Sequence, residues 1–252
     1  MILEGNTVFI TGGGSGIGRG LAEAFHKRGN QVIIGGRRKA ALDETAAANP
    51  GIKTIVFDVA NKESISRGAA ELIRRFPDLN VVVNNAGVQK ATNFAGKIDE
   101  RDFEAEIDTN IYGVLRVTSA FLEHLKEKPS ATIVNLSSGL AFMPMARFPV
   151  YCATKAFVHS FSMTLRRQLS GTSVRVIELA PPWVVTDLGG DHTPPVAREG
   201  RPGPMPLAGF IEAAMQGLAS DVEELPVAGA KFLYDAGVAP GAAAAFGKLN
   251  AE

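Results

Sequence analysis

The chain has 252 residues, 46% of them hydrophobic, which is enough for one large core in a single domain spanning 1–252. Its 26 lysines and arginines balance 26 aspartates and glutamates without a long basic run, which excludes the charge pattern of a nucleic-acid-binding protein and favours a small-molecule partner. Cys152 is the only cysteine, which excludes an internal disulfide and a cysteine-rich zinc site and fits a reducing compartment.

The chain enters its first strand-like run almost at once. The N-terminus lacks the basic start and apolar stretch of a signal peptide, and no apolar run approaches the length that spans a bilayer. We therefore expect a cytoplasmic protein without a membrane partner.

Short β-branched runs alternate with longer segments that carry apolar residues at helical spacing. The predicted strands are 7–11, 31–35, 53–57, 80–84, 132–136 and 173–179. The predicted helices are 17–28, 40–48, 62–76, 102–126 and 151–169. The strands are almost continuously hydrophobic, which is typical of strands buried on both faces. The repeated βα pattern predicts an α/β fold with a parallel sheet covered by helices on both sides.

A glycine-rich turn joins the first predicted strand to the first helix. It reads Thr11-Gly12-Gly13-Gly14-Ser15-Gly16-Ile17-Gly18. Glycines allow a tight turn and let backbone N–H groups approach a pyrophosphate, which the positive end of the helix also favours. Its place after the first strand of a βαβ unit favours dinucleotide binding over a loop that merely turns.

Tyr151 and Lys155 stand four residues apart, so on a helix they share one face. A phenol titrates near about pH 10, and a nearby ammonium lowers that pKa by favouring the phenolate. Such a pair can move a proton on and off an alcohol. On its own, the spacing also fits two residues on a solvated helix face.

Five motifs in order give these features a common interpretation. They are Thr-Gly-x-x-x-Gly-x-Gly at 11–18, Asn84-Asn85-Ala86-Gly87, Asn110, Ser137-Ser138 and Tyr151-x-x-x-Lys155. Over roughly residues 5–187 the chain resembles the short-chain dehydrogenases/reductases. The resemblance implies a Rossmann-type, doubly wound parallel sheet and an enzyme that interconverts a ketone and a secondary alcohol with a nicotinamide cofactor.

The resemblance also implies a role for each catalytic residue. Tyr151 is the acid/base that exchanges a proton with the substrate oxygen. Ser138, favoured by spacing over Ser137, donates a hydrogen bond to that oxygen. Lys155 lowers the pKa of the tyrosine and holds the nicotinamide ribose, and Asn110 bends its helix around a water that relays the proton.

The residues at the end of the second strand determine the cofactor preference. An acidic residue there binds the ribose hydroxyl of NAD, and a cation binds the 2′-phosphate of NADP. In the family, aspartate at the position of Gly36 marks NAD preference and arginine at the position of Arg37 marks NADP preference. The chain has Gly36, Arg37 and Arg38, so we expect NADP(H) over NAD(H). The alternative is that these cations merely begin a solvated helix.

The resemblance extends to a full set of expected cofactor contacts. They are Gly12, Gly14, Ser15, Gly16, Ile17, Gly18, Arg37, Arg38, Asp58, Val59, Asn85, Ala86, Gly87, Tyr151, Lys155, Pro181, Val184 and Thr186. For Asp58 an ordinary capping role stays open. We expect no metal site.

The chain departs from the family pattern after the sixth strand. Pro182 stands where a glycine is usual, and proline stiffens the loop and removes an N–H. The Gly- and Pro-rich stretch that follows predicts a substrate-binding loop over 186–207. The usual last strand is not recognisable in 228–235, and since that strand often builds an interface in the family, we expect a monomer or homodimer.

Six apolar side chains lie in segments expected around the site mouth: Phe142, Met143, Met145, Phe148, Trp183 and Met205. One interpretation is that these side chains pack in the core. The other is that they line the mouth of the site, which favours a bulky or apolar carbonyl substrate. One alternative function is a non-catalytic NADP(H) sensor, although such proteins tend to lose the tyrosine or lysine. Another is a dehydratase or epimerase, whose larger C-terminal domain this chain has no room for.

Overall fold

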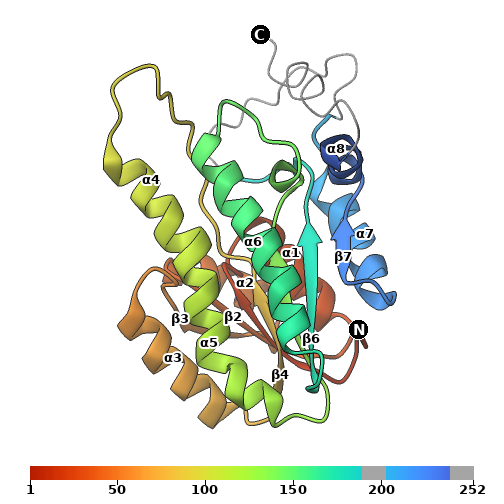
Figure 1. Ribbon diagram of the computed structural model, residues 1–252. Helices are drawn as coiled ribbons and strands as arrows, with labels where there is room; N and C mark the ends of the chain where they lie inside the picture. Colours follow the sequence, from red (N-terminus) through yellow and green to blue (C-terminus); the bar gives the residue numbers. More distant parts are fainter. Residues whose placement is uncertain (189–202, 239–252) are drawn as a thin grey trace.

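A seven-stranded parallel sheet forms the centre of the protein in the computed structural model, which describes residues 1–188 and 203–238 (Figure 1). The strands are β1 Thr7–Thr11, β2 Gln31–Gly36, β3 Lys53–Val56, β4 Leu79–Asn84, β5 Ala131–Leu136, β6 Val174–Ala180 and β7 Glu224–Pro226. Their order is β3-β2-β1-β4-β5-β6-β7, so the direction of winding reverses between β1 and β4. In such a sheet, ligands bind at the carboxyl ends of the strands near this reversal.

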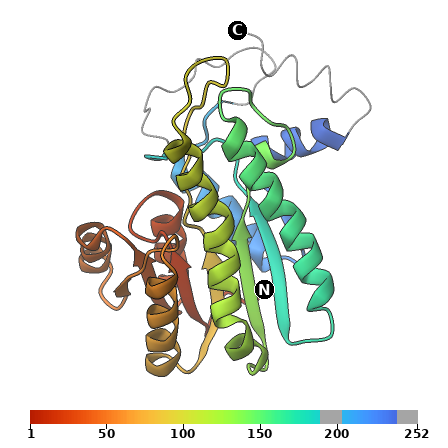
Figure 2. The same ribbon diagram turned by 60° about the vertical axis from the view of Figure 1, so that its left-hand side comes forward.

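Helices cover both faces of the sheet, as Figures 1 and 2 show. They are α1 Gly16–His26, α2 Lys39–Ala48, α3 Lys62–Arg75, α4 Glu100–Ile107, α5 Gly113–Lys126, α6 Pro149–Gln168, α7 Leu207–Ala219 and α8 Gly229–Val238. A π-helical segment, Asp108–Tyr112, joins α4 to α5, and a 3₁₀ turn, Gly139–Ala141, follows β5.

Two hydrophobic layers follow from the alternation of side chains along the strands. On β1, Ile10 packs into the layer that includes Phe25 of α1 and Phe210 of α7. Phe9, its neighbour, points to the other face and packs in the layer with Phe121 of α5. Every residue of β1 is buried, as the continuous hydrophobicity predicted.

The predicted Rossmann-type α/β fold is confirmed, and the six predicted strands lie within one residue of their observed ends. The continuous helix predicted over 102–126 is wrong, because the π-helical segment interrupts it. A single inserted residue changes the hydrophobic period too little to be seen in sequence. The substrate loop predicted over 186–207 ends one residue earlier, since Leu207 begins α7, and 189–202 lie outside the described residues.

The last strand lies before the segment 228–235, where the family pattern had led us to look for it. Residues 228–235 belong mainly to α8, and the seventh strand is β7, which comes just before it. β7 has three residues and includes Pro226, which cannot donate a ladder hydrogen bond, so it lacks a strand-like sequence pattern. The expectation of a monomer or homodimer rested on the absence of this strand. Because the strand is present, that reason no longer holds.

Across the two described stretches, no helix is both long enough and apolar enough to cross a membrane.

Candidate active site

The sequence motifs meet at the carboxyl edge of the sheet, beside the reversal of winding. The glycine-rich turn follows β1, Asn85 follows β4, Ser138 follows β5 and Pro181 follows β6. Because parallel strands end at the same edge, four segments far apart in sequence are brought together there.

The glycine-rich turn is packed so closely that side chains are excluded from it. Gly12 and Gly16 have φ of 69° and 52°, in the left-handed region that favours glycine. A Cβ on Gly18 would lie 2.3 Å from the carbonyl oxygen of Gly12, and one on Gly13 would lie 2.5 Å from Ile34. The start of α1 follows directly, and the Ser15 side chain makes no capping hydrogen bond there. This cradle fits a dinucleotide pyrophosphate at the helix N-terminus.

The turn is held by residues that follow β4. The Asn85 side-chain amide donates to the carbonyl of Thr11 at 2.8 Å and to that of Gly12 at 3.3 Å. The backbone N–H groups of Asn85 and Ala86 both donate to Thr11 Oγ1 at 3.1 Å. The Asn85 side chain, expected from the sequence to contact the cofactor, therefore shapes the turn that would bind it.

Tyr151 and Lys155 lie one turn apart on α6 and are both buried, with exposed fractions of 5% and 6%. The Ser138 side chain accepts from Leu140 N at 3.1 Å and interacts with the Tyr151 phenol. Lys155 Nζ donates to the carbonyl of Leu136 at 2.8 Å and lies 5.6 Å from the centroid of the Tyr151 ring. The sequence spacing thus brings Ser138, Tyr151 and Lys155 into one buried group, and Ser137, the neighbouring candidate, is buried as well.

Burial controls the protonation of this group. It lowers the pKa of Lys155 from 10.5 to about 8, while the Glu178 carboxylate acts in the opposite direction. Burial raises the pKa of the Tyr151 phenol, and the hydrogen bond with Ser138 opposes it. Desolvation of the phenolate outweighs the interaction with Ser138, and Lys155 is not among the groups that shift the pKa of Tyr151 in this structure. The lowering of the tyrosine pKa by Lys155 stays a prediction.

Asn110 lies in the π-helical segment and is almost completely buried. Its side chain accepts from Val88 N at 2.9 Å and donates to Val88 O at 2.9 Å and to Thr154 Oγ1 at 3.0 Å. A Cβ on Gly87 would lie 3.4 Å from Asn110 Oδ1 and 3.7 Å from Lys155 Nζ, so Gly87 lies between the two side chains. The expected bend at Asn110 is present as a π-helical segment, a feature frequent at functional sites.

The three cations after β2 have different surroundings. Arg38 Nη2 donates to Ser15 Oγ at 2.9 Å, at the start of α1, and Lys39 forms an ion pair with Asp43. Arg37 is exposed and makes no hydrogen bond or ion pair with any described residue. The strand end that precedes it contacts the glycine-rich turn, where Gly13 N donates to the carbonyl of Gly35 at 3.1 Å.

The expected adenine contacts have structural partners of their own. Asp58 Oδ1 accepts from Ala60 N at 3.0 Å in a local turn, whereas the N-cap of α3 is Asn61, so Asp58 is not the helix cap of the alternative interpretation. Val59 is buried, and a Cβ on Gly113 would lie 3.0 Å from its side chain.

The segment after β6 lies beside the same turn. A Cβ on Gly16 would lie 3.3 Å from Thr186 Cγ2, so Thr186 reaches the start of α1. Val184 is buried and pairs with Met205 in an isolated parallel bridge, which closes the two ends of the loop segment against each other.

The apolar residues expected around the mouth separate into two groups. Met143 is buried. Phe142 packs edge-on against His159 of α6 and Tyr234 of α8, so it serves the contact between these helices. Trp183 is 43% exposed and keeps its place as a substrate-side candidate.

A series of buried side-chain hydrogen bonds connects β4 and β5 to α6, and no sequence pattern predicted it. Asn84 Nδ2 donates to Asn135 Oδ1 at 2.8 Å, and Asn135 Nδ2 donates to Ser162 Oγ at 3.0 Å. Asn84 and Asn135 are register partners on β4 and β5, and strand register is not readable from sequence alone.

Comparison with known proteins agrees with this geometry. A family model described as short chain dehydrogenase matches residues 6–196. An uncharacterised oxidoreductase, DltE, of Bacillus subtilis is 47% identical over 189 residues, 75% of each chain. The NADP-dependent 3-hydroxy acid dehydrogenase YdfG of Salmonella typhimurium is 38% identical over 177 residues, 69% of this chain and 71% of the relative.

A solved structure covers still more of the chain. The 3-ketoacyl-(acyl-carrier-protein) reductase of Brucella melitensis, in complex with NADH, is 28% identical and superposes with a TM-score of 0.83, over 90% of this chain and 98% of that one.

Proposed function

Since this chain belongs to the short-chain dehydrogenase family and is an NAD(P)-dependent oxidoreductase, we propose that it reduces a ketone to a secondary alcohol, or the reverse, with Tyr151 as the acid/base. The observation that carries the proposal is the buried group of Ser138, Tyr151 and Lys155, in which Ser138 interacts with the Tyr151 phenol and Lys155 lies one helical turn away. The sensor alternative loses support, because both Tyr151 and Lys155 are present and buried at the same edge as the dinucleotide turn.

In the proposed mechanism, the nicotinamide supplies the hydride when the cofactor is bound. The Ser138 hydroxyl donates a hydrogen bond to the substrate oxygen, where negative charge develops. The phenol of Tyr151 gives its proton to the same oxygen. Burial keeps this phenol protonated near neutral pH, which is the form that reduction requires.

Lys155 and Asn110 support the proton transfer from the other side of Tyr151. With a pKa of about 8, Lys155 is mostly charged at neutral pH and can still exchange its proton. We place the relay of that proton in the space beside Gly87, between Asn110 Oδ1 and Lys155 Nζ. By resemblance to the family, Lys155 would also hold the nicotinamide ribose and so couple cofactor placement to proton transfer.

The test of this mechanism is Tyr151→Phe, which removes the hydroxyl and little volume. We expect turnover of a ketone, followed by the loss of NADPH absorbance, to fall by about 10²- to 10⁴-fold while NADPH still binds. Tyr112→Phe is the matched control, since Tyr112 is 46% exposed and packs under Arg116. Turnover of Tyr151→Phe near that of the control contradicts the mechanism.

We propose further that the enzyme prefers NADP(H). Arg37, exposed directly after β2, supports this preference, because arginine binds a phosphate through two parallel hydrogen bonds. Relatives differ in this respect: YdfG is named as NADP-dependent, whereas the Brucella reductase was solved with NADH.

Arg37→Ala tests this preference. We expect the ratio of catalytic efficiency with NADP to that with NAD to fall by about 10- to 100-fold, since one charge-assisted contact is worth about 1.5–3 kcal/mol. Lys39→Ala, which removes a cation already paired with Asp43, is the control. An unchanged ratio in Arg37→Ala means that the preference lies elsewhere.

For the substrate we propose a carbonyl compound with an apolar or bulky group. The exposed apolar side chains of Trp183, Val185 and Leu188 beside Thr186 support this proposal. The acid named for YdfG makes 3-oxo acids the natural comparison in a substrate panel. The homodimer and the cytoplasmic location expected from the sequence stay predictions.

A further inference from the structure

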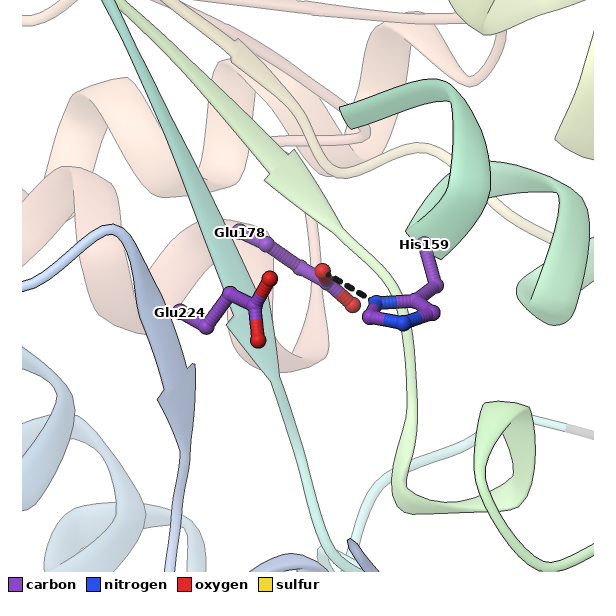
Figure 3. A group of neighbouring side chains, drawn as sticks. All are labelled: His159, Glu178 and Glu224. Carbon is purple, nitrogen blue, oxygen red and sulfur yellow. Dashed lines mark hydrogen bonds and ion pairs between the residues drawn. The ribbon is translucent and has the colours of Figure 1, made fainter. Parts of the chain in front are cut away.

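A cluster of one histidine and two glutamates lies outside the proposed catalytic group, where α6 crosses the last two strands (Figure 3). His159 comes from α6, Glu178 from β6 and Glu224 from β7. One ligand atom from each of the three side chains lies within 4.8 Å of the others. Nothing in the sequence suggested this group, since its members are far apart along the chain.

The strand register explains why the two carboxylates are neighbours. Glu178 and Glu224 are register partners in the parallel pair β6–β7, so their side chains leave the sheet side by side. Like charges directly opposite each other in a sheet destabilise it. Their placement is therefore costly unless a positive group lies between them.

Glu178 is the residue with the greatest need for a cation. Its side chain is 1% exposed. Oε2 is 2.7 Å from Nδ1 of His159, whereas Oε1 is buried without a hydrogen-bond partner among the described residues. Figure 3 shows this carboxylate between His159 and Glu224. A buried carboxylate oxygen without a partner is costly, so one coordination position remains open inside the cluster.

Arg166 does not fill this position. Its Nη1 lies 3.5 Å from Glu224 Oε1, and its other contacts are with Glu223 and the carbonyl of Val176. The guanidinium therefore neutralises the outer side of the cluster. Glu178 keeps His159 as its hydrogen-bond partner and interacts with the Lys155 ammonium only through longer-range electrostatics, so Oε1 stays without a hydrogen bond among the described residues.

We propose that His159, Glu178 and Glu224 bind a divalent first-row metal ion, for which Zn²⁺ is the best match. One imidazole nitrogen with two carboxylates suits Zn²⁺ better than Mg²⁺, which prefers oxygen ligands. A tetrahedral Zn²⁺ holds its ligand atoms about 3.4 Å apart. Ligand atoms now up to 4.8 Å apart would therefore close by up to about 1.4 Å, and His159 Nδ1 and Glu178 Oε2, now 2.7 Å apart, would open slightly. His159 and Glu224 side chains are 24% and 27% exposed, which leaves room for a water as the fourth ligand.

The consequence of binding is a cross-link between three elements. His159 lies four residues after Lys155 on the same helix, so the ion would tie α6 to the edge of the sheet one turn beyond the proposed catalytic group. The competing state is a purely structural His159–Glu178 ion pair, and the hydrogen bond to Glu178 does raise the pKa of His159.

The test is Zn²⁺ binding by the full-length protein after treatment with a chelator, followed by calorimetry and by metal analysis after gel filtration. We expect one Zn²⁺ per chain and a rise in the melting temperature on loading. Glu224→Gln and His159→Gln should each weaken binding at least about tenfold and abolish the rise. Glu223→Gln, which changes the adjacent carboxylate, and His26→Gln, which changes a histidine at the end of α1, should bind as the wild type does.

Three outcomes overturn the proposal: no Zn²⁺ bound by the wild type, unchanged affinity in both site variants, or Mg²⁺ bound as tightly as Zn²⁺. If His159→Gln fails to fold because Glu178 loses its partner, Glu224→Gln decides the matter alone, since its side chain is partly exposed.

Discussion

At the scale of single residues, the properties of Lys155 depend on burial more than on its spacing from Tyr151. The ammonium is 6% exposed and donates to the Leu136 carbonyl, and its pKa falls to about 8. The sequence identified the residue and its partner. It could not show that desolvation would raise the pKa of Tyr151, because burial is a property of everything packed around the phenol.

The buried lysine predicts a particular pH dependence of stability. Its folded pKa of about 8 lies below the ordinary value of 10.5, so between these values the unfolded chain binds more protons than the folded one. The free energy of unfolding should therefore rise with pH across this window, by roughly 1–3 kcal/mol. Above about pH 10, the raised pKa of Tyr151 works in the opposite direction.

Urea denaturation at about pH 7.5 and about pH 10 checks this. Lys155→Met should lose the rise, whereas Lys62→Met, at the exposed start of α3, should keep it. The same pH dependence in wild type and Lys155→Met would show that the ammonium is not desolvated as the structure indicates.

At the scale of elements, the turn between β1 and α1 was readable from sequence because glycine has a distinctive steric role. The π-helical segment was not readable as such, although the resemblance led us to expect a bend at Asn110. The Asn110 side chain donates hydrogen bonds to Val88 and Thr154, which are distant in sequence, so tertiary contacts select the π conformation.

Gly18→Ala should destabilise the turn. The new Cβ would lie 2.3 Å from the Gly12 carbonyl oxygen and 2.4 Å from Asn85 Nδ2, so backbone has to move. We expect a loss of about 1–3 kcal/mol in the free energy of unfolding without cofactor. Gly171→Ala is the control, since a Cβ there meets nothing within 4 Å. Equal stability of the two variants would mean that the turn can make room for a Cβ at residue 18.

At the scale of the whole molecule, arginines from α6 and β6 hold the edge strand β7 in place. β7 pairs with β6 through only three residues. Arg166 of α6 donates to the carbonyls of Val176 and Glu223 and so joins the helix to both strands. Arg175 of β6 donates to the Val222 carbonyl and pairs with Asp221.

Arg166→Ala should loosen this edge without unfolding the protein. Loss of its charge-assisted hydrogen bonds to backbone carbonyls, worth about 1.5–3 kcal/mol, should speed hydrogen exchange at Leu225 and Val227 by about 10- to 100-fold. Exchange in β1, at the centre of the sheet, should not change. Arg167→Ala, the exposed neighbour on α6, provides the comparison, and equal protection of β7 in both variants would contradict the anchoring role.

The sequence by itself determined the α/β class, the strand and helix alternation, and the identity of the candidate catalytic residues. The fold class, the turn and the Tyr151–Lys155 pair depend on local patterns: hydrophobic period, glycines at a turn, and i to i+4 spacing on a helix. Ser138 and Asn110 were identified by the resemblance to the family. Tertiary structure alone decided the strand order, the short edge strand β7, the raised pKa of Tyr151, and the meeting of His159, Glu178 and Glu224. Each of these depends on burial or on the register between distant segments, and neither quantity is a property of any one stretch of sequence.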